Sequence, residues 1–263
     1  MARNVLVTGS SHGIGAAVAI AFAKQGDNVG VVYNKTLDGA EKTAAACREY
    51  GVDVQIYKAD LSVREECVKL MDDFLAHFKT IDVLINDAGG ALVIPKGEFV
   101  DMPLDYWDSQ IALNLNSAAY LTQGAIRNMK ANNIPGRIVN ISSVHASVSW
   151  CRRKMLPYCA AKAGIEMFTK AIAVEVAKYG IRVNCVAPGF IQTKLSDRYS
   201  DRDVQGFKRK IAAGFLGQVE HIVPAILFLS DIKSTEYIVG RTLTVDGGQT
   251  IDGIIDCMLE DEF

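Results

Sequence analysis

The sequence predicts an α/β fold: a single, doubly wound domain whose parallel sheet has seven strands and carries helices on both faces. Short apolar runs rich in β-branched residues alternate with segments of helical periodicity, as in consecutive βα units. The chain has 263 residues, of which 49% are hydrophobic, and this suffices for one large core. The expected strands are residues 4–8, 28–33, 53–58, 81–85, 136–142, 181–187 and 242–245.

Domain organisation follows from the continuity of this pattern. No linker or low-complexity segment interrupts it, so we expect residues 1–250 to form one domain and 251–263 to extend beyond it as a tail. Residues 194–214 are polar, rich in charge and long for a connection. They predict a mobile lid over a substrate.

Composition excludes several functional classes. Net charge is -2, and no basic block exceeds Arg152-Arg153-Lys154, so neither nucleic acid nor an anionic membrane is an expected partner. No apolar run approaches about 18 residues and the start does not resemble a signal peptide, which predicts a soluble cytoplasmic protein. The six cysteines show no Cys-x-x-Cys spacing, so we expect reduced thiols, no disulfide and no metal site.

A glycine turn follows the first strand. Gly9, Gly13 and Gly15 lie between that strand and a helical run. Glycines let backbone N–H groups approach a pyrophosphate, and the helix N-terminus attracts its negative charge. Turns of this kind also exist for close packing alone, but the place at the first strand of an α/β chain favours a phosphate cradle.

Tyr158 and Lys162 form a second candidate site. Residues four apart share one face of a helix, and of the nine tyrosines only Tyr158 has a lysine four residues later. A nearby ammonium favours the phenolate and lowers the pKa of a tyrosine, which makes the pair a proton-transfer device. The alternative is a tyrosine that packs on the stem of a surface lysine.

The glycine turn has one more residue between its first two glycines than the usual dinucleotide fingerprint, and it resembles that of the short-chain dehydrogenase/reductase family. Both 3-oxoacyl-reductase-like and sugar-dehydrogenase-like members are similar. The resemblance implies a Rossmann domain and an oxidoreductase that interconverts a ketone or aldehyde with an alcohol. The other motifs that carry it are Asp60, Asn86-Asp87-Ala88-Gly89, Asn114, Ser142-Ser143, Tyr158 with Lys162, Pro188-Gly189 and Asp246-Gly247-Gly248.

The resemblance assigns a catalytic role to four residues. It implies that Tyr158 passes the proton, while Lys162 holds the nicotinamide ribose and lowers the pKa of Tyr158. It also implies that Ser143 positions the substrate oxygen, and that Asn114 supports a water linking the lysine to solvent.

Dinucleotide contacts are implied in the same way. NADP(H) is favoured over NAD(H), because no carboxylate ends the second strand and Lys35 there attracts a 2′-phosphate; Lys35 as a solvated loop charge is the alternative. Asp87 stands where the family more often has asparagine, and an ionised carboxylate cannot donate a hydrogen bond. The implied cofactor residues are Gly9, Ser11, His12, Gly13, Ile14, Gly15, Asn34, Lys35, Asp60, Leu61, Asn86, Ala88, Gly89, Tyr158, Lys162, Pro188, Gly189, Ile191 and Thr193.

The substrate side is less specific. The step from Ser143 to Tyr158 is fifteen residues, about two more than we expect for the family, and the extra length is basic and aromatic. Arginines there predict either a solvated loop or a site for an anionic substrate group. The candidate substrate residues are Ser143, His145, Trp150, Arg152 and Arg153.

Several functions remain open at this point. A 3-oxoacyl thioester reductase, a sugar or polyol dehydrogenase and a hydroxysteroid dehydrogenase share these motifs, and a non-catalytic dinucleotide-sensing protein is the alternative class. The small-molecule substrate is the expected partner, together with a second copy of the chain. Helices expected at 107–131 and 157–179 predict a homotetramer or homodimer, because they carry apolar residues on more than one face: Ala118, Ala119, Leu121, Ile165, Phe168 and Ile172.

Overall fold

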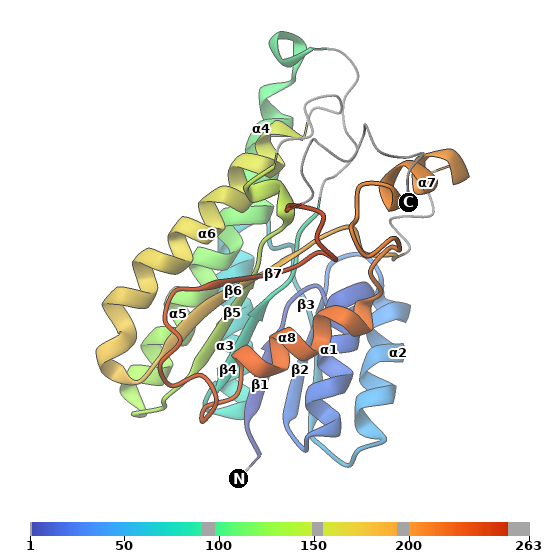
Figure 1. Cartoon of the computed structure of the whole chain (residues 1–263). Helices are drawn as coiled ribbons and strands as arrows, with labels where there is room; N and C mark the ends of the chain where they lie inside the picture. Colours follow the sequence, from blue (N-terminus) through green and yellow to red (C-terminus); the bar gives the residue numbers. More distant parts are fainter. Residues whose placement is uncertain (1, 91–97, 149–154, 194–199, 252–263) are drawn as a thin grey trace.

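A computed structural model describes residues 2–90, 98–148, 155–193 and 200–251, and it confirms a single α/β domain in three layers (Figure 1). Seven strands form one sheet in the order β3-β2-β1-β4-β5-β6-β7, and every neighbouring pair is parallel. The strands are β1 Asn4–Val7, β2 Asn28–Tyr33, β3 Val54–Lys58, β4 Val83–Asn86, β5 Arg137–Ile141, β6 Arg182–Pro188 and β7 Thr242–Val245.

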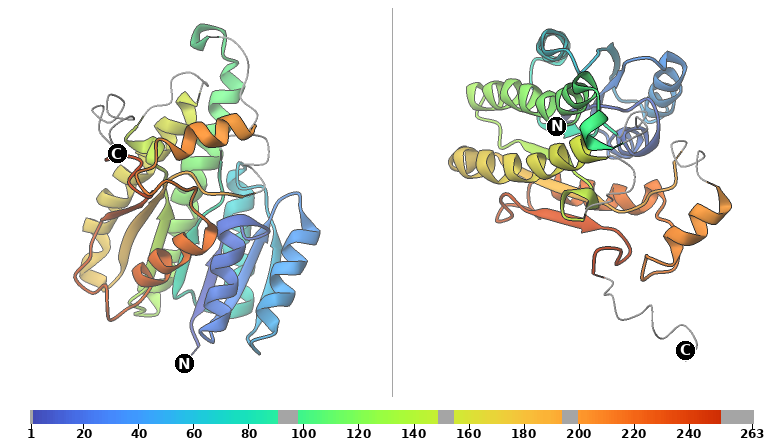
Figure 2. Two further views of the ribbon diagram at one scale, coloured as in Figure 1. Left: turned by 45° about the vertical axis from the view of Figure 1, so that its right-hand side comes forward. Right: turned by 90° about the horizontal axis from the view of Figure 1, so that it is seen from above.

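Helices cover both faces of the sheet, as the two views of Figure 2 show. One face carries α1 Gly13–Lys24, α2 Leu37–Arg48 and α8 Val219–Leu229. The other carries α3 Arg64–Phe78, α5 Ser117–Ala131 and α6 Leu156–Val176.

The two-residue period of the strands builds both layers. In β1, Val5 and Val7 pack with Phe22 of α1, whereas Leu6 between them packs with Phe74 of α3 on the opposite face. Successive side chains of a strand point to opposite faces, so a strand buried on both sides reads as a continuous apolar run. This is why the strands were recognisable in the sequence.

The order of the strands reverses beside β1. This strand lies between β2 and β4, so the loops that follow β1 and β4 diverge at the carboxyl ends of the strands. Ligands of open α/β sheets bind in the crevice that such a switch point creates.

The helix expected at 107–131 is longer and less regular than predicted. It begins with α4 Leu104–Ile111, passes through a π-helical turn at Ala112–Asn116 and continues as α5. A π turn displaces the residues inside it from the regular α register, and such turns are frequent at functional sites. Here it contains Asn114.

The predicted helix 157–179 corresponds to α6 and a short 3-10 turn, Ala177–Tyr179. Pro157 lies in the first turn of α6, where a missing N–H costs nothing, and Gly180 ends the helix with φ 76°. None of the helices in the described part is long and apolar enough to cross a membrane. No disulfide joins the cysteines of the described part, which are Cys47, Cys67, Cys159 and Cys185.

Candidate active site

A cavity of about 700 Å³ opens at the carboxyl ends of the strands. Residues from the loops after all seven strands line it, and α6 supplies one wall. Its volume lies within the range of small-molecule and cofactor pockets. The switch point predicted by the topology is therefore the site of the pocket.

The glycine turn forms the floor of this cavity. Gly9 and Gly13 have φ of 68° and 61°, a region that other residues adopt only with strain. A Cβ on Gly9 would lie 2.9 Å from the Cα of Ala88, and one on Gly15 would lie 2.7 Å from the carbonyl oxygen of Gly9. The side chain of the N-cap residue His12 makes no cap hydrogen bond, and the Asp87 carboxylate accepts from the Gly15 N–H, so the start of α1 still offers backbone N–H groups that fit the pyrophosphate of a dinucleotide.

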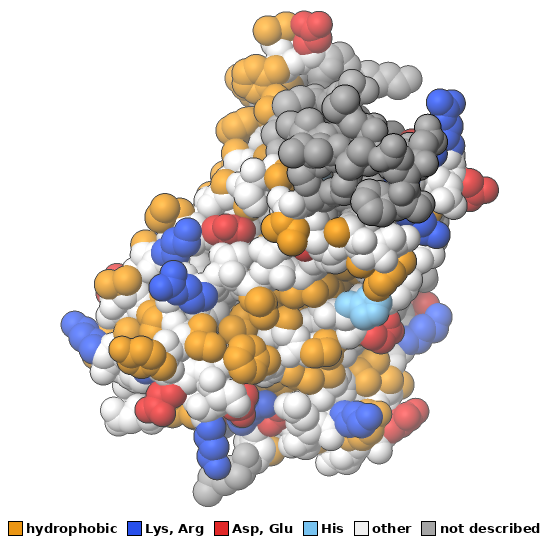
Figure 3. All heavy atoms as spheres, in the orientation of Figure 1, with side chains coloured by type: hydrophobic (Ala, Val, Ile, Leu, Met, Phe, Trp, Pro, Cys, Tyr) orange, Lys and Arg blue, Asp and Glu red, His pale blue; other side chains and the backbone are white. Residues whose placement is uncertain are grey.

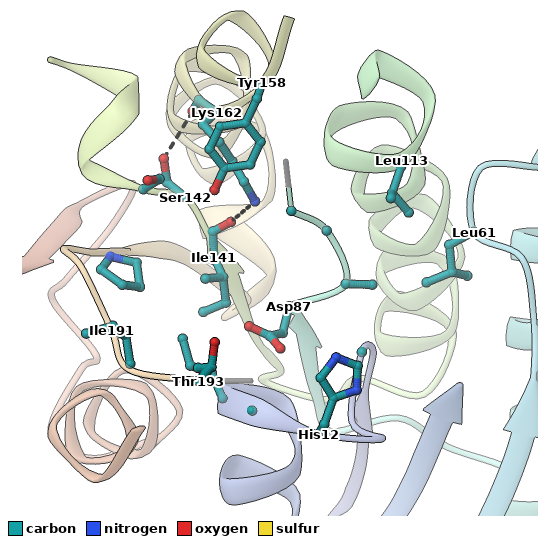
Figure 4. Close-up of a pocket in the computed structure, with 18 of the residues that line it drawn as sticks. His12, Leu61, Asp87, Leu113, Ile141, Ser142, Tyr158, Lys162, Ile191 and Thr193 are labelled. Atoms are coloured by element: carbon teal, nitrogen blue, oxygen red, sulfur yellow. Dashed lines mark hydrogen bonds between the residues drawn. The ribbon is translucent and has the colours of Figure 1, made fainter. Parts of the chain in front are cut away.

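Tyr158, Lys162 and Ser143 meet on the wall of the cavity. The first two project from successive turns of α6, and Ser143 follows β5. The Ser143 hydroxyl donates a hydrogen bond to the Tyr158 phenol oxygen. The Lys162 ammonium donates to the carbonyl oxygen of Ile141 at 2.7 Å, shown dashed in Figure 4, and lies 5.6 Å from the centre of the Tyr158 ring.

The pKa of Tyr158 differs from the expectation. Burial raises it to about 12, and the hydrogen bond from Ser143 opposes this only in part. The neighbouring Cys159 and Asp87 raise this pKa further, and the Lys162 ammonium, which is directed at Ile141, does not lower it in the ligand-free chain. The predicted phenolate is therefore wrong for this state, and at neutral pH Tyr158 carries its proton.

Asn114 forms hydrogen bonds with the segment that follows β4. Its side chain is buried, donates from Nδ2 to the carbonyl oxygens of Gln110 at 3.0 Å and Gly90 at 3.3 Å, and accepts at Oδ1 from the Gly90 N–H at 2.8 Å. A Cβ on Gly89 would lie 2.6 Å from that Oδ1. Asn114 thus lies behind the pocket wall and holds Gly89 and Gly90 in place.

Polar groups gather where β2 and β3 end. Ser62 donates to the Asp60 carboxylate from its hydroxyl at 2.6 Å and its N–H at 3.0 Å. These bonds, with smaller contributions from Asn34 and Lys35, hold the pKa of Asp60 below its usual value. Asp38, the nearest carboxylate after Lys35, pairs with Lys42 at 2.8 Å and does not line the cavity.

Comparisons with known proteins agree with this geometry. Residues 9–250 match the family model described as enoyl-(acyl carrier protein) reductase. The chain belongs to the short-chain dehydrogenase/reductase family. It is 35% identical to glucose 1-dehydrogenase 2 of Bacillus subtilis over 252 residues, 95% of each chain, and 35% identical to 3beta-hydroxysteroid dehydrogenase 1 of Eggerthella lenta over 252 residues, 95% and 94% of the two chains.

A solved structure extends the likeness to three dimensions. Acetoin dehydrogenase YohF from Salmonella typhimurium superposes with a TM-score of 0.87 at 31% identity, covering 97% of this chain and 98% of that one. As a short-chain dehydrogenase/reductase, the chain is an oxidoreductase that binds an NAD(P) dinucleotide.

Most of the predicted site residues of this short-chain dehydrogenase/reductase line the cavity. Asn114, Asn86 and Gly15 do not line it. The Asn86 amide donates to Asn140 at 2.8 Å and to Thr122 at 3.2 Å, and so joins β4, β5 and α5. Trp150, Arg152 and Arg153 lie outside the described residues. The predicted residues that line the cavity are Gly9, Ser11, His12, Gly13, Ile14, Asn34, Lys35, Asp60, Leu61, Ala88, Gly89, Ser143, His145, Tyr158, Lys162, Pro188, Gly189, Ile191 and Thr193.

The structure adds lining residues that the motifs did not indicate. Leu113, Val144 and Met155 give the pocket an apolar portion. Gln249 lies two residues after Gly247 and accepts a hydrogen bond from the Phe190 N–H at 3.1 Å, which ties the end of β7 to the loop after β6. His145 lies beside Tyr158, with ring centres 6.1 Å apart, and burial lowers the pKa of His145.

The ionisation of Tyr158 can be measured directly. The phenolate absorbance of the ligand-free wild type, minus that of Tyr158→Phe, should show no ionisation from Tyr158 below about pH 10, two units under its pKa of about 12. The physical reason is burial of the ring. A phenolate that appears near neutral pH in this difference would contradict the ligand-free geometry.

Proposed function

We propose that this chain is an NADP(H)-dependent oxidoreductase that interconverts a ketone or aldehyde with its alcohol. The observation that carries the proposal is the group on the cavity wall: two hydroxyls, Ser143 and Tyr158, are hydrogen-bonded to each other, with the buried Lys162 ammonium beside them. The glycine cradle opens into the same cavity, so a bound dinucleotide and a carbonyl compound would meet here.

The residues divide the chemistry among them. The dinucleotide supplies the hydride. Tyr158 is protonated at neutral pH, so its hydroxyl can give a proton to the oxygen on which charge develops during reduction. With substrate bound, the Ser143 hydroxyl would turn from the phenol oxygen and donate to that same substrate oxygen. Lys162 would hold the ribose hydroxyls and stabilise the phenolate that forms. Asn114 fixes the segment beside Lys162.

The preference for NADP(H) is supported by the end of β2. Lys35 is exposed there, lines the cavity and lacks an ion pair among the described residues. His12 lines the same cavity from the glycine loop and hydrogen-bonds the Ser11 hydroxyl through Nδ1 at 2.9 Å. Cationic or donor groups at this point would bind the 2′-phosphate.

The proposed substrate is a small carbonyl compound or alcohol of one of three classes: a 3-oxoacyl thioester, a sugar or polyol, or a hydroxysteroid. The named relatives cover more than one of these classes. An apolar portion of the pocket and the neutral His145 favour a substrate with an uncharged side. Oxidation of reduced dinucleotide against a panel of such carbonyl compounds would decide.

We also propose that residues 1–250 form the working domain and that the segment 194–214 closes over the substrate. Within its described part, helix α7 Asp201–Lys208 begins with a capping box at Ser200 and Asp203. Phe207 of α7 stacks on Phe190, which lines the cavity, with ring centres 4.3 Å apart. A helix in contact with the pocket wall is suited to respond to what the pocket holds. The cytoplasm, where its thiols stay reduced, is the proposed location.

A dinucleotide-sensing protein without catalysis is the second candidate, because a fold alone does not establish activity. The hydrogen bond between Ser143 and Tyr158 argues against it, since a sensor needs no proton donor at the cavity wall. Binding of dinucleotide without turnover of any carbonyl compound would favour the sensor.

Removing one oxygen atom tests the role of Tyr158. Tyr158→Phe keeps the ring but deletes the transferable proton, so the rate should fall by about 10²- to 10⁴-fold. The dissociation constant for NADPH should change by less than about twofold. Single-turnover kinetics alongside dinucleotide titration measure both, with Tyr179→Phe on the surface as the matched control. An active Tyr158→Phe enzyme would remove this residue from the mechanism.

Removing one charge tests the cofactor preference. Lys35→Ala should weaken NADPH binding by about tenfold, less at high salt because Lys35 is exposed, and should leave NADH binding within about threefold. Lys42→Ala removes a neighbouring exposed lysine that pairs with Asp38, so it serves as the control. If Lys35→Ala weakened the binding of NADPH and NADH equally, or weakened neither, Lys35 would be a solvated surface charge without a role in cofactor preference.

The chain is proposed to form a homodimer or homotetramer. Ala118, Leu121 and Ile165 pack inside the subunit, so the outward apolar surface differs from the one expected. On α6 its most exposed members are Met167 and Val174, which are 63% and 78% exposed. A second face lies over α8 and the edge strand β7, where apolar side chains gather in Figure 3. Such faces favour association.

Light scattering measures the mass of the particle in solution, and so the number of chains in it. The wild type should give the mass of a dimer or tetramer at micromolar concentration, and Met167→Glu with Val174→Glu should reduce it, because two charges would be buried in the interface. Val68→Glu, at an apolar site on α3 that is 50% exposed, should leave the mass unchanged. A wild-type monomer contradicts the proposal.

A further inference from the structure

Asp87 is a half-buried acid in the floor of the pocket that the proposed reaction does not use. The Thr8 hydroxyl accepts hydrogen bonds from the N–H groups of Asp87 at 3.0 Å and Ala88 at 2.9 Å, and so fixes the backbone. The Asp87 carboxylate accepts from the Gly15 N–H. A Cβ on Gly15 would lie only 2.7 Å from Oδ2 of Asp87. The carboxyl is therefore held against the last glycine of the phosphate cradle.

The carboxyl also points into the cavity. Figure 4 shows it directed into the space between Ile141, Thr193 and His12, and it belongs to the cavity lining. An anion bound at the start of α1 would therefore lie beside it, since Gly13 and Gly15 belong to that first turn.

Few charges balance this acid. On α6 the titratable groups are Lys162 and Tyr158, on the glycine loop His12, and on β6 Cys185, which acts on Lys162. Within the described chain Asp87 forms no ion pair. Burial raises the pKa of Asp87 to about 7, although the Lys162 charge and the Gly15 N–H oppose the rise.

We propose that Asp87 takes up a proton from solvent when a dinucleotide binds, so that affinity for the dinucleotide falls as the pH rises through neutrality. This inference rests on dinucleotide binding in the cradle. It makes Asp87 a residue that sets the charge of the site, not a catalytic residue.

The physical reason is repulsion between like charges. A pyrophosphate carries two negative charges, and a carboxylate beside it in a partly dehydrated pocket raises the free energy of the complex. Protonation of Asp87 removes this repulsion and converts its oxygen from an acceptor into a donor. The proton taken up at Asp87 is the only covalent change.

The sign of the pH dependence follows by linkage. The bound anion stabilises the neutral acid, so the pKa of Asp87 is higher in the complex than in the free chain, where it is about 7. Affinity is fully present below the pKa of the free chain. It falls by up to about tenfold for each pH unit above that value, until the pH reaches the pKa of the complex.

The first experiment measures dissociation constants for NADH and NADPH from about pH 6.5 to 9 by fluorescence of the reduced nicotinamide. NADH isolates the effect of the pyrophosphate, because a phosphate monoester such as the 2′-phosphate of NADPH itself titrates near pH 6. In the wild type both dissociation constants should rise above neutrality. In Asp87→Asn, which is neutral at every pH, they should stay nearly constant and be lower than wild type at the alkaline end.

Calorimetry on the wild type supplies a second readout that needs no variant. Binding heats measured near pH 8 in two buffers with different ionisation enthalpies should report uptake of a fraction of a proton that approaches one. The same titration of Asp87→Asn should report almost none.

Matched variants assign the proton to Asp87. Asp82→Asn changes another acid whose pKa burial raises, at the opposite end of β4, and should keep the wild-type pH dependence. His12→Gln should also keep it. If Lys162 were the titrating group, Asp87→Asn would retain the loss of affinity and move it to lower pH, because the variant removes a negative charge near the ammonium.

The outcomes are separable. A chain that binds neither dinucleotide at any pH overturns the proposed function together with this inference. Binding that is independent of pH in the wild type overturns the role of Asp87 alone. So does a pH dependence that survives in Asp87→Asn or disappears in His12→Gln.

Discussion

The contact on which the site depends is the hydrogen bond from the buried Lys162 ammonium to the carbonyl oxygen of Ile141. A buried charge is stable only with a partner, and this carbonyl ends β5. The bond therefore ties α6 to the carboxyl edge of the sheet. Tyr158 lies one helical turn earlier, so the same tie brings its phenol to Ser143, which also follows β5. The Ser142 hydroxyl, which donates to the carbonyl oxygen of Lys162 at 3.1 Å, supports the same tie between α6 and the end of β5.

Burial shifts the titratable groups of this site toward their neutral forms. It raises the pKa of Tyr158 and Asp87 and lowers that of Lys162. The partial exception is the mutual attraction of Asp87 and Lys162, which favours the charged form of each. The site is therefore sensitive to any anion placed beside it, because the charged and neutral forms of Asp87 are nearly balanced at neutral pH. A carboxyl at position 87, in place of the family's more usual amide, creates this balance.

The fold was predictable because the central strands are short apolar runs separated by helical segments. In β1 the residues Val5, Leu6 and Val7 alternate between the two layers, and this pattern can be read from the local sequence. The pairing of Tyr158 with Lys162 was predictable from helical spacing. The direction of the Tyr158 pKa shift was not, because it depends on burial and on the distant Ile141 carbonyl. Contacts such as Asn114 with Gly90 join residues far apart in the chain, and no local pattern marks them.

The central claim is that a hydride passes from the dinucleotide to a carbonyl carbon at the wall formed by Ser143, Tyr158 and Lys162. The most direct measurement uses two preparations of reduced dinucleotide, each with deuterium on a different face of the transferable nicotinamide carbon, and a panel of carbonyl substrates. The account predicts an alcohol with deuterium on its carbinol carbon from one face only, and with its hydroxyl proton from solvent. Oxidation of the dinucleotide without deuterium in any product alcohol would contradict it.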